Sequence, residues 1–232
     1  MPLLSDAAAL YLGGKAVEAV YLGGELVWSA GGNKIPILYH RLVADDGTTH
    51  RDFIKAHVDS ISDFQWLEEV VGDDIATHGI TSGTVIVTSP TVAALSQAVA
   101  DFYAATINPF FTFSRYASSA GGLTTLGGST TSIGMKALSA ALTHPVGIAL
   151  KVQNVDDEVT MLSSGTYNTG RDTAKEGTVG LFYSGATERL CLAYRIDGQV
   201  RKMFFAFGSV AYVTNDFWAC FEAGVRYVAQ PE

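Results

Sequence analysis

The stretch Tyr11-Leu-Gly-Gly-Lys-Ala-Val-Glu-Ala-Val-Tyr21-Leu-Gly-Gly-Glu-Leu-Val-Trp28 repeats the pattern YLGGxxV with a period of ten residues. Gly-Gly between two apolar runs is a signal for a two-residue hairpin turn, because both turn positions require a positive φ angle. Two such hairpins in succession predict a three-stranded β-meander at the start of the chain.

A turn at Gly23-Gly24 sets the register of the second hairpin. It places Leu22 opposite Glu25, Tyr21 opposite Leu26 and Ala19 opposite Trp28. Cross-strand partners share a face of the ribbon, and side chains alternate along each strand. One face therefore collects a nearly continuous set of apolar side chains, with Lys15 at its rim: Leu10, Leu12, Val17, Ala19, Tyr21, Leu26 and Trp28.

A ribbon of about twenty residues cannot bury such a face by itself. Residues 29–33, Ser-Ala-Gly-Gly-Asn, are typical of a flexible joint, so we expect the ribbon to pack on something other than its own main domain. The sequence predicts an assembly interface formed by Leu10, Leu12, Val17, Tyr21, Leu26 and Trp28.

The doubled segment resembles the N-terminal hairpin pairs of tailed-bacteriophage tail, collar and fibre proteins, which carry a doubled LYLGxxxVxxVYLGxxxVW pattern. The resemblance covers about 18 of the 232 residues and rests on the repeated Tyr-Leu-Gly and the closing Val27-Trp28. Gly14 and Gly24 stand where Asp or Asn is equally expected. The resemblance implies that residues 10–28 attach the protein to other virion proteins or to copies of itself. It implies a virion protein made in the host cytoplasm, and by analogy with fibres a trimer.

The second half of the chain has the pattern of an all-β domain. From Pro145 onward, seven apolar-rich runs are separated by turn residues, and residues 188–208 form a hairpin pattern with Asp197-Gly198 at its tip. These runs predict a jelly-roll-like β-sandwich over residues 118–232. They loosely resemble concanavalin-like or laminin-G-like sandwiches, on the segments beginning at Gly147, Met161 and Leu192.

Residues 34–117 have a mixed α/β pattern. Strands are expected at residues 35–43, 83–88 and 110–116, and a helix at residues 89–105 with Ser89 as its N-cap and Pro90 in its first turn. Residues 51–71 fit neither period clearly. We therefore expect a mainly β protein with one or two helices, divided into a hairpin module at residues 1–33 and a body at residues 34–232.

Composition excludes several classes of function. The formal net charge of -8, without a basic stripe, disfavours binding to nucleic acid. No window reaches the roughly 18 apolar residues of a membrane span. The charged fraction of 16% is below the roughly 25% of ordinary domains, as expected if other subunits cover part of the surface. Cys191 and Cys220 are expected as buried thiols, with a disulfide as the alternative.

Sequence patterns for catalysis are missing. The five histidines lack metal-ligand spacing, the adjacent acidic pairs do not suit a glycosidase, and no GxSxG motif occurs. Residues 165–172 mimic a phosphate-binding loop, but Arg171 and Asp172 replace its Lys and Ser/Thr. We expect no catalytic residue, cofactor or metal. In the same loop Tyr167, Asn168 and Arg171 are candidates for binding a host surface glycan, which is the alternative function; a depolymerase is the third.

Overall fold

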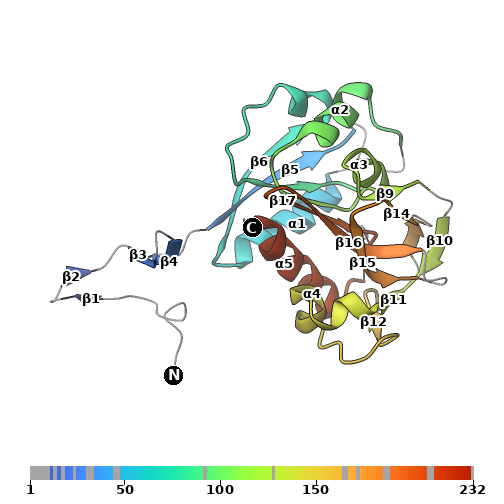
Figure 1. Cartoon of the computed structure of the whole chain (residues 1–232). Coiled ribbons are helices and arrows are strands. Elements are labelled where there is room, and N and C mark those ends of the chain that lie inside the picture. Colours follow the sequence, from blue (N-terminus) through green and yellow to red (C-terminus); the bar gives the residue numbers. More distant parts are fainter. Residues whose placement is uncertain are drawn as a thin grey trace.

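The computed structural model describes residues 11–12, 15–16, 19–22, 25–29, 34–43, 48–90, 93–126, 129–163, 167–170, 173–184, 189–207 and 212–230. Their main feature is a nine-stranded mixed β-sheet with helices on both faces (Figure 1). In their order across the sheet the strands are β12 (Glu158–Thr160), β11 (Gly134–Ala137), β15 (Thr178–Tyr183), β16 (Leu190–Asp197), β17 (Val200–Phe205), β8 (Phe110–Thr112), β7 (Val85–Thr88), β5 (Ile35–Arg41) and β6 (Phe64–Val71).

The helices form the two outer layers. They are α1 (Thr49–Ser60), η2 (Gly72–Ala76), α2 (Gln97–Ala105), α3 (Arg115–Ala120), η3 (Ser139–Leu142), α4 (Pro145–Ala149) and α5 (Asn215–Ala229). α1 and α5 share one face of the sheet, where His57 stacks on Trp218 with ring centroids 3.6 Å apart. α2 and α3 lie on the opposite face (Figure 1).

The sheet has a parallel half and an antiparallel half. β6, β5, β7, β8 and β17 run parallel to one another, and from β17 the sheet continues through β16, β15, β11 and β12 in antiparallel pairs. β7 and β8 are buried along their whole length, which suits strands covered by helices on both faces. The strands expected near residues 35–43 and 83–88 and the hairpin with Asp197-Gly198 at its tip are confirmed.

The described part of residues 118–232 does not form the expected β-sandwich. Its longer strands extend the single large sheet, and helix α5 covers that sheet where a further strand was expected. The run is helical because its buried residues recur every three or four positions and because the Thr214 hydroxyl accepts from the backbone N–H of Phe217. The strand expected from Pro145 onward is also wrong, because helix α4 begins at this residue. The coarser expectation of a sheet-rich protein with helices is confirmed.

Helix α2 begins later than expected. The Ser89 hydroxyl accepts from the backbone N–H of Leu42 at 3.0 Å, and the helix begins eight residues further on, at Gln97. Ser96 caps α2 instead, by accepting from Val99 N at 3.2 Å.

Both YLGG repeats form strand pairs. β1 (Tyr11–Leu12) pairs with β2 (Lys15–Ala16), and β3 (Ala19–Leu22) pairs with β4 (Glu25–Ser29). The pairing of Tyr21 with Leu26 is confirmed, but Val20 rather than Ala19 faces Trp28, because the register shifts between Val20 and Tyr21. Among the described residues the two hairpins are separate two-stranded sheets, so the three-stranded meander is not completed.

Four short strands form two further two-stranded sheets. β10 (Ser129–Ser132) pairs with β13 (Tyr167–Gly170), and β14 (Thr173–Ala174) pairs with β9 (Thr124–Thr125).

The β16–β17 hairpin is tied to the end of α3 by buried charge. The ammonium of Lys202 lies 2.8 Å from the Asp197 carboxylate and donates to the Gly121 carbonyl at 3.3 Å. Arg195 donates to the Gly122 carbonyl at 3.2 Å. Burial alone would raise the pKa of Asp197, but the hydrogen bonds from Lys202 and Arg195 outweigh it and lower that pKa. Cations at the C-terminal end of a helix also suit its dipole.

Replacing Gly224 with Ala is expected to destabilise the protein by about 1–3 kcal/mol, although Ala is the better helix former. A Cβ at this position of α5 would collide with the Phe111 ring and lie 2.9 Å from the Met203 sulfur. The Phe111 ring is fully buried and cannot move aside without disturbing the core. Urea unfolding monitored by circular dichroism measures the effect.

Gly79→Ala is the matched control, because a Cβ there meets nothing within 4 Å. We expect Gly79→Ala to leave the urea midpoint unchanged or slightly raised. Equal midpoints for the two variants would show that α5 does not lie as close to the sheet as described.

Candidate functional site

The order of the parallel strands changes direction at β5. From β5 the chain passes through α1 to β6 on one side, and then returns through η2 to β7 on the other side. The carboxyl ends of β5 and β7 therefore border the switch point, which is where open α/β sheets bind ligands. The residues at this edge make it the first candidate site.

His40, at the end of β5, is fully buried there. Its Nδ1 lies 2.8 Å from the Tyr103 hydroxyl, and its Nε2 lies 3.0 Å from the Gly72 carbonyl. Since a carbonyl only accepts, Nε2 carries the hydrogen and Nδ1 accepts from Tyr103. Burial lowers the pKa of His40 to about 4, against smaller opposing effects of the Gly72 hydrogen bond and the Asp73 charge. The neutral ring links β5, α2 and η2.

Buried hydroxyl groups fix the neighbouring strand ends. The hydroxyls of Thr88 and Thr112 lie 2.8 Å apart, and the Thr88 hydroxyl also accepts from the backbone N–H of Phe113 at 3.2 Å. The Ser114 hydroxyl accepts from Ala117 N at 3.3 Å and so caps α3. These hydrogen bonds hold the ends of β7 and β8 and the start of α3 together.

The opposite face of the same edge carries a second buried histidine. His50 Nδ1 lies 2.8 Å from the Tyr39 hydroxyl, and its ring packs edge-on against Phe113 with centroids 4.9 Å apart. Its Nε2 has no hydrogen-bond partner within the described part of the chain. Burial lowers the pKa of His50 to about 3, so this ring is neutral as well.

Charged residues beside His50 pair with one another. Glu69 accepts from Arg41 Nε at 2.9 Å and from Arg51 at 2.8 Å. Arg51 also pairs with Asp52. The guanidinium groups are thus held by carboxylates at the rim of the edge.

The carboxyl edge has the chemistry of a structural junction. Both of its histidines use Nδ1 to bind a tyrosine hydroxyl.

Cys191 and Cys220 are free and buried, and burial together with the Asp216 charge raises the pKa of the Cys220 thiol. The described residues contain no group of three or more His, Cys, Asp or Glu able to hold a metal ion. No helix among them is long and apolar enough to cross a membrane.

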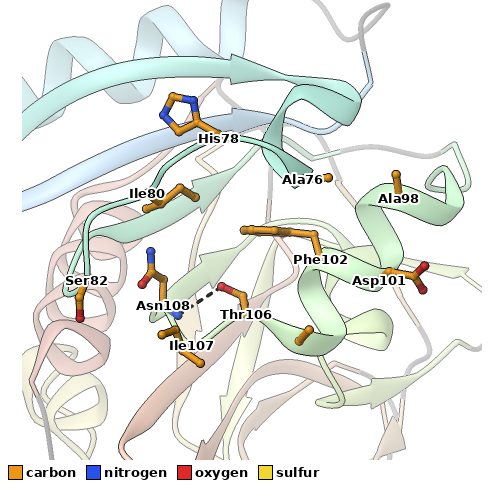
Figure 2. Close-up of a pocket in the computed structure, with 11 residues that line it drawn as sticks. Ala76, His78, Ile80, Ser82, Ala98, Asp101, Phe102, Thr106, Ile107 and Asn108 are labelled. Carbon is orange, nitrogen blue, oxygen red and sulfur yellow. Dashed lines mark hydrogen bonds between the residues drawn. The ribbon is translucent and has the colours of Figure 1, made fainter.

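A second candidate site is an open pocket of about 560 Å³ between α2 and the connection that follows η2 (Figure 2). Figure 2 shows Phe102 of α2 and Ile80 of the connection directed into the space between these two segments. Ile107 lies at one end and is 77% exposed.

The rim of this pocket is polar. The Asp101 carboxylate accepts from Gln97 at 2.7 Å, and His78 Nε2 lies 3.1 Å from a Glu68 oxygen. Asn108 is buried and reaches the Thr81 carbonyl at 3.5 Å. An apolar floor with a polar rim suits the docking of an apolar group better than it suits catalysis.

The residues predicted from the sequence lie elsewhere. Leu12, Tyr21, Leu26 and Trp28 belong to the N-terminal hairpins, where Tyr21 and Leu26 are cross-strand partners. Leu10 and Val17 lie outside the described residues.

Two of the three predicted glycan-binding residues lie in a strand rather than in a long loop. Tyr167 and Asn168 open β13 and pair with Ser132 and Thr131 of β10. Arg171 lies outside the described residues.

Sequence reasoning did not single out His40, Tyr103 or His50. The signal for His40 was a polar residue inside the apolar run IPILYHRLV, since a polar side chain is buried only with hydrogen-bond partners. Its partner Tyr103 is 63 positions away, and no local pattern connects the two.

Comparison with known proteins shows the fold. No family model and no curated protein matches the sequence. The cytoplasmic protein STM1381 from Salmonella typhimurium LT2 matches at 11% identity with a TM-score of 0.52, over 84% of this chain and 100% of that chain. The exo-β-1,4-mannosidase Op5Man5 from Opitutaceae bacterium strain TAV5 matches at 10% identity and a TM-score of 0.50, over 86% of this chain.

This chain spans only 36% of the mannosidase. A ThuA-like protein from Bacteroides uniformis ATCC 8492 matches at 9% identity with a TM-score of 0.47, over 87% of this chain and 91% of that chain. At such low identity the first two likenesses show a shared arrangement of sheet and helices and nothing about activity.

Replacing His40 with Gln is expected to reduce the acid sensitivity of the fold. Between about pH 4 and pH 6.5 the unfolded imidazole binds a proton that the folded His40 does not, so His40 makes stability fall as the pH is lowered through this window. The contribution between pH 7 and pH 5 is about 2 kcal/mol. Urea unfolding at both pH values measures the fall for each protein.

The readout is the difference between the two pH values, which separates titration from the general cost of losing the Tyr103 hydrogen bond. A fall of the same size in wild type and His40→Gln would contradict the assignment of a buried neutral imidazole.

Proposed function

We propose that this chain is a structural component of a tailed-phage virion, a fibre, spike or adaptor subunit, that assembles through its N-terminal hairpins. The observation that carries the proposal is the pairing of β1 with β2 and of β3 with β4, outside the nine-stranded sheet. The doubled YLGG segment that resembles phage attachment hairpins thus forms strand pairs of its own.

The physical support is the instability of such ribbons alone. A two-stranded hairpin is at best marginally stable in water unless a third strand or another apolar surface covers it. The hairpin segment is rich in large apolar residues, and each of their side chains would contribute about 1.5–3 kcal/mol on burial. Burial against other chains supplies the missing cover.

The partners in this proposal are other virion proteins and copies of the same chain. A trimer follows by analogy with fibres, in which three ribbons enclose one apolar axis. The site of action is the virion. The proposal assigns no catalytic role to the body, whose buried histidines and hydroxyls are engaged in holding strand ends together.

The glycan-binding alternative has less support. It relied on a C-terminal sandwich that presents a long loop, whereas the strands of this region extend the large sheet. Tyr167 and Asn168 lie in the β10–β13 pair instead.

Deleting residues 1–30 is expected to convert an oligomer into a folded monomer, because the deletion removes both hairpins and leaves β5 and the body intact. Size-exclusion chromatography with light scattering measures the mass, and circular dichroism reports folding. Deleting residues 1–9 alone is the control, since it spares both strand pairs and should leave the mass unchanged. An oligomer that survives removal of residues 1–30 rules out the proposal.

A further inference from the structure

Helix α4 has only five residues, and its own hydrogen bonds hold it weakly. The backbone N–H of Ile148 donates to the His144 carbonyl at 3.0 Å. The backbone N–H of Leu150 donates to the Val146 carbonyl, also at 3.0 Å. Isolated helices shorter than about 12–15 residues are marginal in water. Lys151, two residues past the end of α4, has a φ of 58°, which is unfavourable for a residue with a side chain. α4 therefore depends on contacts from outside the helix.

One such contact is a cap supplied by His144. Its Nδ1 accepts from the backbone N–H of Val146 at 3.2 Å, in the first turn of α4. An acceptor on the N-cap residue stabilises the start of a helix, because the first N–H groups have no partner within it. A neutral imidazole accepts at Nδ1 only when its hydrogen is on Nε2, and a protonated imidazole carries hydrogens on both nitrogens. His144 can therefore cap α4 only while its ring is neutral.

The ring of His144 also connects α4 to the sheet and to α5. The residue is only 6% exposed, and its ring centroid lies 4.8 Å from that of Tyr194 on β16 and 4.2 Å from that of Tyr227 on α5. Its Nε2 has no hydrogen-bond partner within the described part of the chain. α4 itself packs against α5 (Figure 1). The cap and these ring contacts together hold α4 in place.

A positive charge on this ring would be unfavourable. The guanidinium of Arg201 on β17 lies over the Tyr227 ring, 4.6 Å from its centroid, so a cation already lies beside the tyrosine that His144 contacts. Burial and, to a smaller extent, the Arg201 charge lower the pKa of His144 to about 4. A second cation here would be both buried and close to the first.

In the part of the chain that the structure describes, no carboxylate offsets the effect of Arg201 on the ring. The titratable groups that face the ring are Tyr194, Tyr227 and Arg201. α4 and η3 contain no charged side chain, and Lys151 is exposed. The remaining charged side chains of α5, β16 and β17 interact with other groups: Asp216, Glu222, Arg226, Arg195, Asp197 and Lys202.

We propose that His144 is an acid-sensitive switch, which holds α4 against α5 while its ring is neutral and releases α4 when its ring binds a proton. A proton taken from solvent removes the cap acceptor and places a second cation near Arg201, and the short helix does not persist without its cap. Release of α4 would uncover Val146 and Tyr227, which are buried in the closed form, with α4 on α5. The switch lies in the body of the protein and is independent of the proposed assembly role.

Acid favours the open form, with α4 released, in a defined pH window. In the open form the imidazole has its ordinary pKa of 6.5, whereas in the closed form its pKa is about 4. Between these values the open form binds more protons than the closed form, so the closed form loses stability as the pH falls from 6.5 to 4. From pH 7 to pH 5 the ratio of open to closed chains rises about twentyfold.

Hydrogen–deuterium exchange of the full-length protein at pH 7 and pH 5 tests the proposal. The reporters are the amides of Val146, Ile148 and Leu150, whose hydrogen bonds break when α4 opens. Their protection factors, which are corrected for the effect of pH on the chemical exchange rate, should fall about twentyfold. The amides of β8 should stay more strongly protected than those of α4 at both pH values, because the body remains folded.

His144→Asn separates titration from capping. Asn is among the best N-cap residues and does not titrate, so the protection of α4 in this variant should change by less than about threefold between the two pH values. His78→Asn is the matched control. His78 is partly exposed, lies 3.1 Å from a Glu68 oxygen and belongs to the connection after η2, so its variant should keep the fall of about twentyfold.

A measurement on the wild type alone covers the case in which His144→Asn does not fold. Nitrogen-15 NMR of the imidazole reports which nitrogen carries the hydrogen. We expect it on Nε2 at pH 7, and we expect Nδ1 to gain a hydrogen only as α4 loses protection. A His144 ring that is protonated near pH 6.5 while α4 stays protected overturns the proposal. Protection of α4 that is unchanged between pH 7 and pH 5, or that falls equally in wild type and His144→Asn, overturns it as well.

Discussion

The parallel pairing of β8 with β7 on one side and with β17 on the other joins strands from the first half of the chain to strands from its second half in one sheet. β8 has only three residues, and all three are buried. Phe110 packs on Tyr103 of the α2 layer, while Phe111 packs on Phe221 of α5. Because both faces of this short strand are covered, it fixes the positions of the two helical layers. The polar network at the carboxyl edge and the pocket beside α2 depend on that placement.

Local features of the chain were predictable and long-range ones were not. The run IPILYHRLV and the Asp197-Gly198 turn specify a strand and a hairpin through neighbouring residues, and both are present. The pairing of β8 with β17 joins residues about 90 positions apart, and an apolar run does not say which strand lies beside it. Without that pairing, the antiparallel strands looked like a separate sandwich. The last of the apolar-rich runs, residues 216–229, resembles a strand in the sequence because its apolar density hides a helical period.

At the candidate site, too, local features were predictable from the sequence and long-range contacts were not. A lone histidine in an apolar strand signals a buried polar contact, but the identity of Tyr103 as its partner depends on how α2 packs. The open pocket is formed by two separate segments of the chain, and Ile107 gives no local sign of its exposure. By contrast, the hairpins of the first 33 residues were predictable because Gly-Gly turns act over two residues. Their proposed role in assembly rests on the marginal stability of a two-stranded ribbon that nothing covers.

The account depends on the N-terminal hairpins being covered by other chains. Hydrogen–deuterium exchange of the full-length protein at increasing protein concentration measures this directly, because amides in an interface exchange more slowly as the complex becomes populated. The account predicts that the amides of β3 and β4 become protected as concentration rises, while those of β8 are protected throughout. Exchange of β3 and β4 that does not change with concentration would contradict it.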